Sequence, residues 1–274
     1  MKRNKVQYGT RQKVTLALGA GIAIVLIVGI VLGYGKLRDI WLEQCVITDM
    51  DRQVSIASGK MVKADVIAEA FGLKCGANLA LIDFDEKRKA LLANVPNLKS
   101  VSVSRTLPDK VSIAIEERTP IARLNPKGRK TVSGHVTDAE GVVFICQRGT
   151  SVLPTIYETS PVPLAPGSRL GGRMLAALQL IEVCREPGFL ELGVLDVDAS
   201  KPDFITATLG NYSQAKVAWE GMDDPTPGTR KNLVRQLTLL VKAIRSNVGE
   251  NTVIWNATDT SEPGCIYADS KGNN

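Results

Sequence analysis

Residues 81–124 read LIDFDEKRKALLANVPNLKSVSVSRTLPDKVSIAIEERTPIARL, and this stretch decides the fold class of the first half of the chain. Acidic residues at its start, basic residues after them and Pro96 beyond them predict a helix. Leu98–Arg105 and Lys110–Glu117 then alternate apolar and polar residues on either side of a Pro-Asp turn. The stretch therefore predicts one helix followed by a β-hairpin.

Two further elements are expected before this stretch. Residues 61–71 place apolar side chains on one helical stripe, and Gly72 follows as a helix stop. A first strand is expected within residues 45–56. The order strand, helix, helix, strand, strand over residues 42–122 predicts a small three-stranded sheet with two helices on one face.

The N-terminal region predicts a membrane anchor. Residues 14–34 carry no charge, and at about 1.5 Å per residue a helix of this length covers the roughly 30 Å hydrocarbon core of a bilayer. Five basic residues and no acid precede it, which places the N-terminus in the cytoplasm and the remainder of the chain on the far side of the membrane. A cleaved signal peptide is the alternative, but this apolar run is longer and no good cleavage site follows it.

The distribution of charge excludes a nucleic-acid-binding surface. The formal net charge is +6, and the five basic residues at the N-terminus supply most of it. The rest of the chain is close to neutral, whereas a phosphate-binding surface needs clustered cations.

The second half of the chain predicts a β-rich region with flanking helices, so that the fold class is α+β. Strand and helix periodicities alternate along it. The expected elements are a hairpin at 136–144, a helix at 173–184, a hairpin formed by 204–209 and 215–219, a long helix at 229–247 and a last strand at 251–257.

Residues 81–124 closely resemble the corresponding stretch of the FtsQ/DivIB cell-division proteins, where it closes the POTRA domain. The resemblance rests on fixed offsets among Gly76, Asn78, Pro96, Val101, Val103, Arg105, Leu107, Pro108, Glu117, Arg118, Pro120 and Ala122. It implies a POTRA domain (βααββ) over 42–122, followed by an FtsQ-type β domain over 123–258. The remaining segments are then a cytoplasmic basic tail (1–13), a transmembrane helix (14–34) and a flexible C-terminal tail (259–274).

The resemblance implies a non-catalytic scaffold of the bacterial divisome. Such a protein binds small bitopic partners of the FtsB/DivIC and FtsL types, and through them regulates septal peptidoglycan synthesis, with the peptidoglycan synthase as a further partner. It is expected in the plasma (inner) membrane at the division septum. A POTRA-bearing component of a polypeptide export or assembly system is the alternative, which one domain copy without a barrel disfavours.

The expected partner-binding residues lie on three surfaces. The first is the last strand, whose open edge is implied to pair with a strand of the partner: Thr252, Val253, Ile254, Trp255, Asn256 and Ala257. Its sequence, TVIWNATDT, lacks the Arg and Tyr that family members usually carry there. The second surface is the neighbouring helix, with Arg235. The third is Arg105 with Glu117 near the POTRA hairpin, and a plain surface ion pair is the competing interpretation of these two residues.

No catalytic, cofactor-binding or metal-binding residues are expected. The chain has five cysteines and a single histidine, without a CxxC pair or the spacing of a zinc site. A membrane-anchored sortase-like transpeptidase is a remote alternative that would use His135 with Cys146 or Cys184. Neither cysteine lies in the strand motif of that family, so buried structural cysteines are the preferred interpretation, and their pairing is left open.

Overall fold

The computed structural model describes residues 10–57, 59–126, 134–158, 164–223, 226, 228–246, 254–259 and 267–269 of the 274-residue chain. Side chains are described from Val25 onward, except those of 158 and 267–269. The chain divides into two compact units. The first comprises residues 1–58, 64–88 and 102–114, and the second comprises 59–63, 89–101 and 115–274.

The chain begins with the long helix α1 (Thr10–Gln44). Among the residues that the structure describes, no helix is both long enough and apolar enough to cross a membrane. Residues 14–24 of the predicted membrane segment lie outside the part whose side chains are described.

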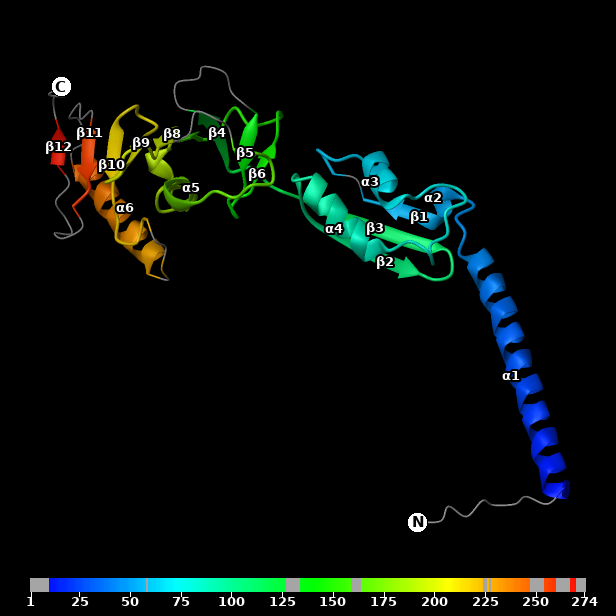
Figure 1. The fold of residues 1–274 in the computed structure, drawn as a ribbon. Helices are drawn as coiled ribbons and strands as arrows, with labels where there is room; N and C mark the ends of the chain where they lie inside the picture. The colour runs from blue at the N-terminus through cyan, green and yellow to red at the C-terminus, as the bar shows by residue number, and fades with distance from the viewer. Residues whose placement is uncertain are drawn as a thin grey trace, which may run out of the picture. The chain divides into compact units, whose positions relative to one another are not determined.

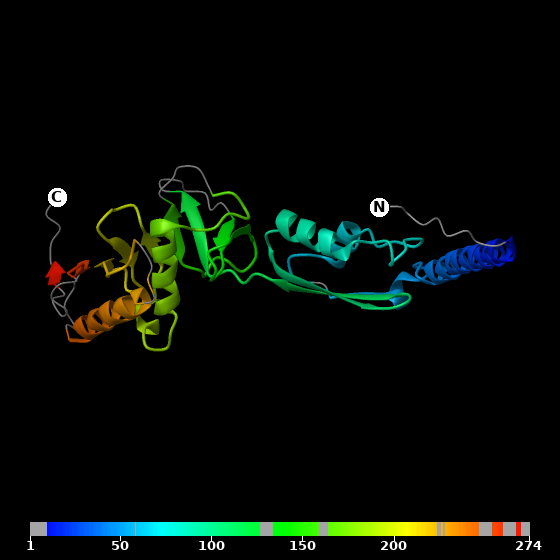
Figure 2. The same cartoon turned by 60° about the horizontal axis from the view of Figure 1, so that its bottom comes forward.

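A three-stranded sheet follows in the strand order β1-β3-β2. Its strands are β1 (Val54–Ile56), β2 (Leu98–Thr106) and β3 (Lys110–Glu117), and β1 runs parallel to β3. Helices α3 (Ala64–Phe71) and α4 (Phe84–Asn94) lie on the same side of this sheet (Figures 1 and 2), and α2 (Met50–Gln53) precedes β1. The predicted order of strand, helix, helix, strand, strand is confirmed.

Local sequence explains where these helices begin and end. The Asp83 carboxylate accepts hydrogen bonds from the backbone N–H groups of Asp85 and Glu86, at 3.1 and 3.0 Å, and so caps α4. Gly72 follows α3 with a φ of +70°, the left-handed conformation that glycine adopts without steric cost. The rings of Phe71 and Phe84 lie 5.8 Å apart and join the two helices in a shared core.

The second unit is built on a nine-stranded sheet in the order β12-β11-β10-β9-β8-β7-β4-β5-β6. Its strands are β4 (Ala122–Pro126), β5 (His135–Thr137), β6 (Val143–Ile145), β7 (Thr155–Glu158), β8 (Asp196–Asp198), β9 (Ile205–Thr208), β10 (Gln214–Val217), β11 (Ile254–Ala257) and β12 (Tyr267–Asp269). Helices α5 (Gly172–Cys184) and α6 (Thr229–Ser246) and the short 3₁₀ helix η1 (Leu190–Leu192) complete it. The predicted hairpins and both predicted helices are present.

The sheet has one apolar face and one polar face. Leu124, Ile156, Val197, Ala207, Ala215 and Trp255 lie in one row across six neighbouring strands, and all are buried in the core that α5 and α6 also enter. Because side chains alternate along a strand, Arg123, Tyr157, Asp196 and Lys216 lie on the opposite face.

One expectation about the C-terminus differs from the structure, and a second falls partly outside the described residues. Residues 259–274 were expected to form a flexible tail, but β12 lies within them and pairs with β11. The last predicted strand, 251–257, is described from Ile254 onward, and Thr252 and Val253 lie outside the described residues.

Candidate functional site

The predicted partner-binding strand β11 is an inner strand of the large sheet. It pairs in parallel with β10 and antiparallel with β12, in which Ile254 faces Asp269 and Asn256 faces Tyr267. The open edge expected at this strand is therefore covered by the chain's own C-terminal segment. In the described part of the chain the edge strand at this end of the sheet is β12.

The side chains of β11 divide between the core and the opposite face. Trp255 and Ala257 are buried, whereas Ile254 and Asn256 are half-buried on the other face. The side chains of Trp255 and Ala257 therefore do not reach a partner, and those of Ile254 and Asn256 are only partly exposed.

Helix α6 lies beside β11 and carries the predicted residue Arg235. Figure 1 shows the two elements next to each other, and Arg235 is exposed. The helix is tied to the strand by Gln236, a buried residue whose Nε2 donates a hydrogen bond of 2.8 Å to the backbone oxygen of Ala257. The sequence pattern did not predict this contact, although a polar residue next to the apolar positions Leu233 and Leu237 is a signal for it.

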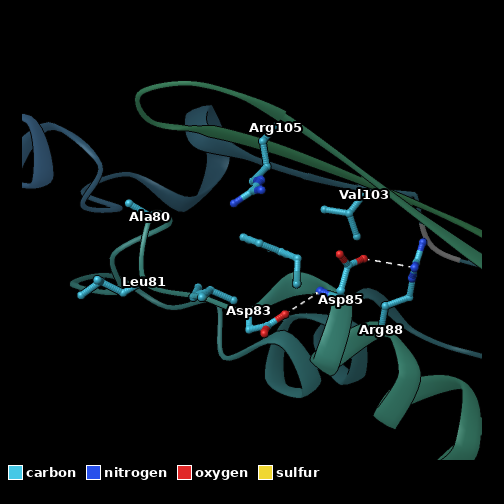
Figure 3. A pocket seen from close by; sticks show the side chains of 9 residues that line it. Ala80, Leu81, Asp83, Asp85, Arg88, Val103 and Arg105 are labelled. Atoms are coloured by element: carbon cyan, nitrogen blue, oxygen red, sulfur yellow. Dashed lines mark hydrogen bonds and ion pairs between the residues drawn. The ribbon is translucent and has the colours of Figure 1, made fainter.

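Arg105 lies at the end of β2, where it lines a cavity of about 530 Å³ (Figure 3). Its guanidinium carbon is 5.2 Å from the centre of the Phe84 ring, a cation–π contact. On the other side of the cavity Asp85 pairs with Arg88 at 3.1 Å. The cavity is lined by Ala80, Leu81, Ile82, Asp83, Phe84, Asp85, Arg88, Val103 and Arg105.

Glu117 has a structural partner of its own and is not paired with Arg105. Its carboxylate accepts hydrogen bonds from the backbone N–H groups of Lys60, Met61 and Val62 at 2.8, 2.7 and 2.7 Å. Three converging backbone donors make a complete binding site for one carboxylate. The competing interpretation of Arg105 and Glu117 as one surface ion pair is therefore wrong.

Arg118, the next residue, forms a partly buried ionic cluster. Its Nη1 lies 2.5 Å from Asp138 Oδ2 and 3.1 Å from Glu140 Oε2. Asp138 Oδ1 accepts the backbone N–H groups of Glu140 and Val142, and Lys99 lies 3.5 Å from Glu140. The hydrogen bond from Arg118 lowers the pKa of Glu140 below its ordinary value.

Comparison with known sequence families connects these residues with one domain type. Residues 51–118 match the family described as POTRA domain, FtsQ-type. The chain carries an FtsQ-type POTRA domain. The match ends at Arg118, so both Glu117 and Arg118 belong to this domain while Arg118 binds residues beyond it.

The curated relatives that this chain resembles carry the name Cell division protein FtsQ. The protein from Streptomyces griseus is 29% identical over 142 residues, which cover 52% of this chain and 64% of the relative. The protein from Streptomyces collinus is 28% identical over 200 residues, which cover 70% of each chain. A protein from Koribacter versatilis is 23% identical over 163 residues and is covered over 44% of its length. The resemblance to FtsQ seen in the sequence is confirmed, and the first of these relatives is matched over less than two thirds of its own length.

The two described cysteines of the sortase-like alternative do not form a nucleophilic site. Cys184 is buried in α5, and burial raises the pKa of its thiol to about 12, so that almost no thiolate exists near neutral pH. Cys146 is buried with Val136 and Phe144 in a small apolar cluster. Both cysteines pack as small apolar side chains.

Proposed function

We propose that this chain is a non-catalytic, single-pass membrane scaffold of bacterial cell division. It would bind small bitopic partners of the FtsB/DivIC and FtsL types and regulate septal peptidoglycan synthesis through them. The observation that carries the proposal is the FtsQ-type POTRA domain at residues 51–118, together with relatives named for cell division that match both halves of the chain. The same match favours a role in cell division over a role in a polypeptide export or assembly system.

The proposed anchor is the apolar segment 14–34, with residues 1–13 in the cytoplasm. The described part of α1 supports an apolar environment, because its large apolar side chains are exposed along the helix: Val25, Leu26, Ile27, Val28, Ile30, Val31, Leu32 and Leu37. In water such a surface would be unfavourable. The folded domains, 42–122 and 123–258, would then lie outside the cytoplasm. Confinement to one membrane raises the effective concentration of the partners, so that individually weak contacts suffice.

The proposed partner surface combines the sheet end at β11 and β12 with the exposed side of α6. A strand edge offers unpaired backbone donors and acceptors that a strand of another chain satisfies. Arg235 adds an exposed cation on α6, the helix that packs beside β11. Arg105 with its cavity, and Glu117, remain a separate candidate surface on the POTRA domain; a partner at Glu117 would compete with the backbone N–H groups of residues 60–62.

Depletion combined with site-specific crosslinking tests the proposal. The full chain, carrying a photoreactive amino acid at Arg235, replaces the native copy in its bacterial host. Cells depleted of the protein should become filamentous, and a fluorescent fusion of the protein should localise to the septum. The photoreactive amino acid should crosslink to small single-span coiled-coil proteins. The same amino acid at Leu190, which is 61% exposed on η1, is the control and should not give these crosslinks. Normal septation after depletion would overturn the proposal.

A further inference from the structure

A second cavity, of about 320 Å³, lies on the polar face of the large sheet. It is lined by Arg123 of β4, Thr155 and Tyr157 of β7, Asp196 of β8, and the segments Ser151–Pro154 and Val194–Leu195 that lead into β7 and β8. Its volume falls at the lower end of the range for small-ligand sites, about 300–1,000 Å³. None of these residues belongs to the partner-binding surfaces proposed above.

The register of the sheet brings the polar side chains of this cavity together. Arg123 is paired with Thr155, and Thr155 with Asp196, across three neighbouring strands. Residues paired in this way point to the same face, and Tyr157, two residues beyond Thr155, shares that face. A cation, a phenol and a carboxylate are therefore held on rigid strands rather than on loops.

Arg123 is oriented by the backbone of residues 153 and 154. Its Nε donates to the oxygen of Leu153 at 3.1 Å, and its backbone N–H donates to the oxygen of Pro154 at 2.8 Å. With Nε occupied, the terminal nitrogens remain as donors for a carboxylate.

Asp196 and Tyr157 supply hydrogen-bond acceptors beside the guanidinium of Arg123. Asp196 Oδ1 accepts a hydrogen bond of 2.8 Å from the Thr208 hydroxyl, which fixes the carboxylate. Burial, and then the charge of Asp196, raise the pKa of Tyr157, so that its phenol stays protonated. A fixed carboxylate and a phenol beside a fixed guanidinium suit a ligand that carries both an anionic group and N–H donors.

The rim of the cavity is apolar. Val152 is 87% exposed and Leu195 is 39% exposed, on the two segments that flank the polar groups. Exposed aliphatic side chains at the mouth of a polar cavity favour a ligand with an aliphatic group next to its charge.

We propose that this cavity is a peptide-binding site for an extended segment in which a carboxylate stands next to an aliphatic residue. Arg123 binds the carboxylate of the peptide, and Asp196 and Tyr157 accept hydrogen bonds from its backbone N–H groups. Val152 and Leu195 contact its aliphatic side chain. The charge complementarity selects a peptide, because a peptide provides all three features within a few ångströms. This inference goes beyond the division scaffold and does not depend on it.

Peptide display on the full chain in phospholipid nanodiscs tests the site. Random heptapeptides are selected on phage, and synthetic versions of the enriched sequences are measured by fluorescence anisotropy. We expect the enriched peptides to carry Asp or Glu beside Leu, Ile or Val. Arg123→Gln removes a charge-assisted contact, and Val152→Asp replaces an apolar contact with a carboxylate. Each variant should weaken peptide binding by about tenfold or more. Val152→Asp tests binding separately from folding, because a side chain that is 87% exposed can be replaced without disturbing the core.

The matched controls are Arg245→Gln and Leu190→Asp, which alter an exposed arginine and an exposed leucine elsewhere on the same unit. They should leave the affinity within about twofold, which corresponds to less than about 0.5 kcal/mol. Peptides with a free C-terminal carboxylate and with an amidated terminus, each with and without the acidic side chain, show which carboxylate Arg123 binds. Absence of enrichment, enrichment of sequences without a carboxylate, or unchanged affinity in a folded Arg123→Gln chain would overturn the proposal.

Discussion

At the scale of single residues, Glu117 and Arg118 show how two neighbours at a strand end hold two different segments. Side chains alternate along a strand, so consecutive residues point in opposite directions. Glu117 binds the backbone of residues 60–62, and Arg118 binds Asp138 in the turn between β5 and β6. The two contacts differ in kind, because one is a carboxylate on backbone donors and the other is an ion pair.

The Arg118 pair should stabilise the second unit far more than an exposed pair does. The side chains of Arg118 and Asp138 are 12% and 7% exposed, whereas those of Arg245 and Glu191 are 66% and 41% exposed. Arg118→Ala leaves a buried carboxylate without its cation and should cost about 3–5 kcal/mol. Arg245→Ala should cost less than about 1 kcal/mol. Urea unfolding followed by fluorescence of the buried Trp219 and Trp255 measures both; equal losses would contradict this account.

Gly59→Ala should break the backbone site that holds Glu117. A Cβ at Gly59 would lie 2.0 Å from Glu117 Oε1. The carboxylate cannot move aside without losing its three N–H donors, so we expect a loss of about 1–3 kcal/mol. Gly188→Ala is the control, since a Cβ there meets nothing within 4 Å. Hydrogen exchange at residues 60–62 should accelerate in the first variant alone.

Glu182 should make stability depend on pH with a definite sign. Burial raises its pKa in the folded state, so its ionised form is disfavoured on folding. The penalty is absent when the pH is below the unfolded pKa of about 4.3 and is complete once the pH exceeds the folded pKa. Glu182→Gln should therefore raise the melting temperature at pH 7.5 and change it less at pH 4. The exposed Glu69→Gln should show no such difference, and an equal gain at both pH values would count against the assignment.

At the scale of elements, the sequence predicted the helices and strands whose own residues show a helical or an alternating apolar pattern. The β2–β3 hairpin and α3, α4, α5 and α6 have clear periodicity, and all are present. Strand β8 contains one apolar residue between two aspartates, and β4 ends in Pro126, so neither shows a strand pattern by itself. Both exist because neighbouring strands satisfy their backbones. The clustering of Arg118 with Asp138 depends in the same way on pairing between distant segments.

The contact between α6 and β11 should depend on Gln236. Gln236→Ala removes a buried donor to the Ala257 oxygen, which keeps the N–H of Ala218 at 3.1 Å as a donor. We expect a loss of about 1–2 kcal/mol, in the range for a buried hydrogen bond and its packing. Thr238→Ala, on the exposed side of the same helix, should change stability by less than about 0.5 kcal/mol. Thermal unfolding of the two variants compares them directly, and equal melting temperatures would show that Gln236 does not tie the helix to the strand.

At the scale of the whole molecule, β12 decides which strand edge the large sheet offers to partners. It lies in a polar C-terminal segment, where no periodicity predicted a strand, and it covers β11. For this reason the edge predicted from the sequence lies one strand too early in the sheet. The assignment of Ile254 to Ala257 as contact residues stays a prediction, and it now requires either addition of a partner beyond β12 or exchange of β12 for the partner's strand.

Two truncations of the full chain separate those alternatives. A chain that ends after Asp259 lacks β12 and leaves the backbone of Ile254–Asn256 unpaired on that side, whereas a chain that ends after Asp269 keeps β12. Unpaired strand edges promote association, so the shorter chain should self-associate and exchange its β11 amides faster. Light scattering and hydrogen exchange measure these effects. If the partner adds beyond β12, only the shorter chain should lose partner crosslinks in cells. If the partner replaces β12, the shorter chain should crosslink more strongly than the longer one, because no strand then has to be displaced.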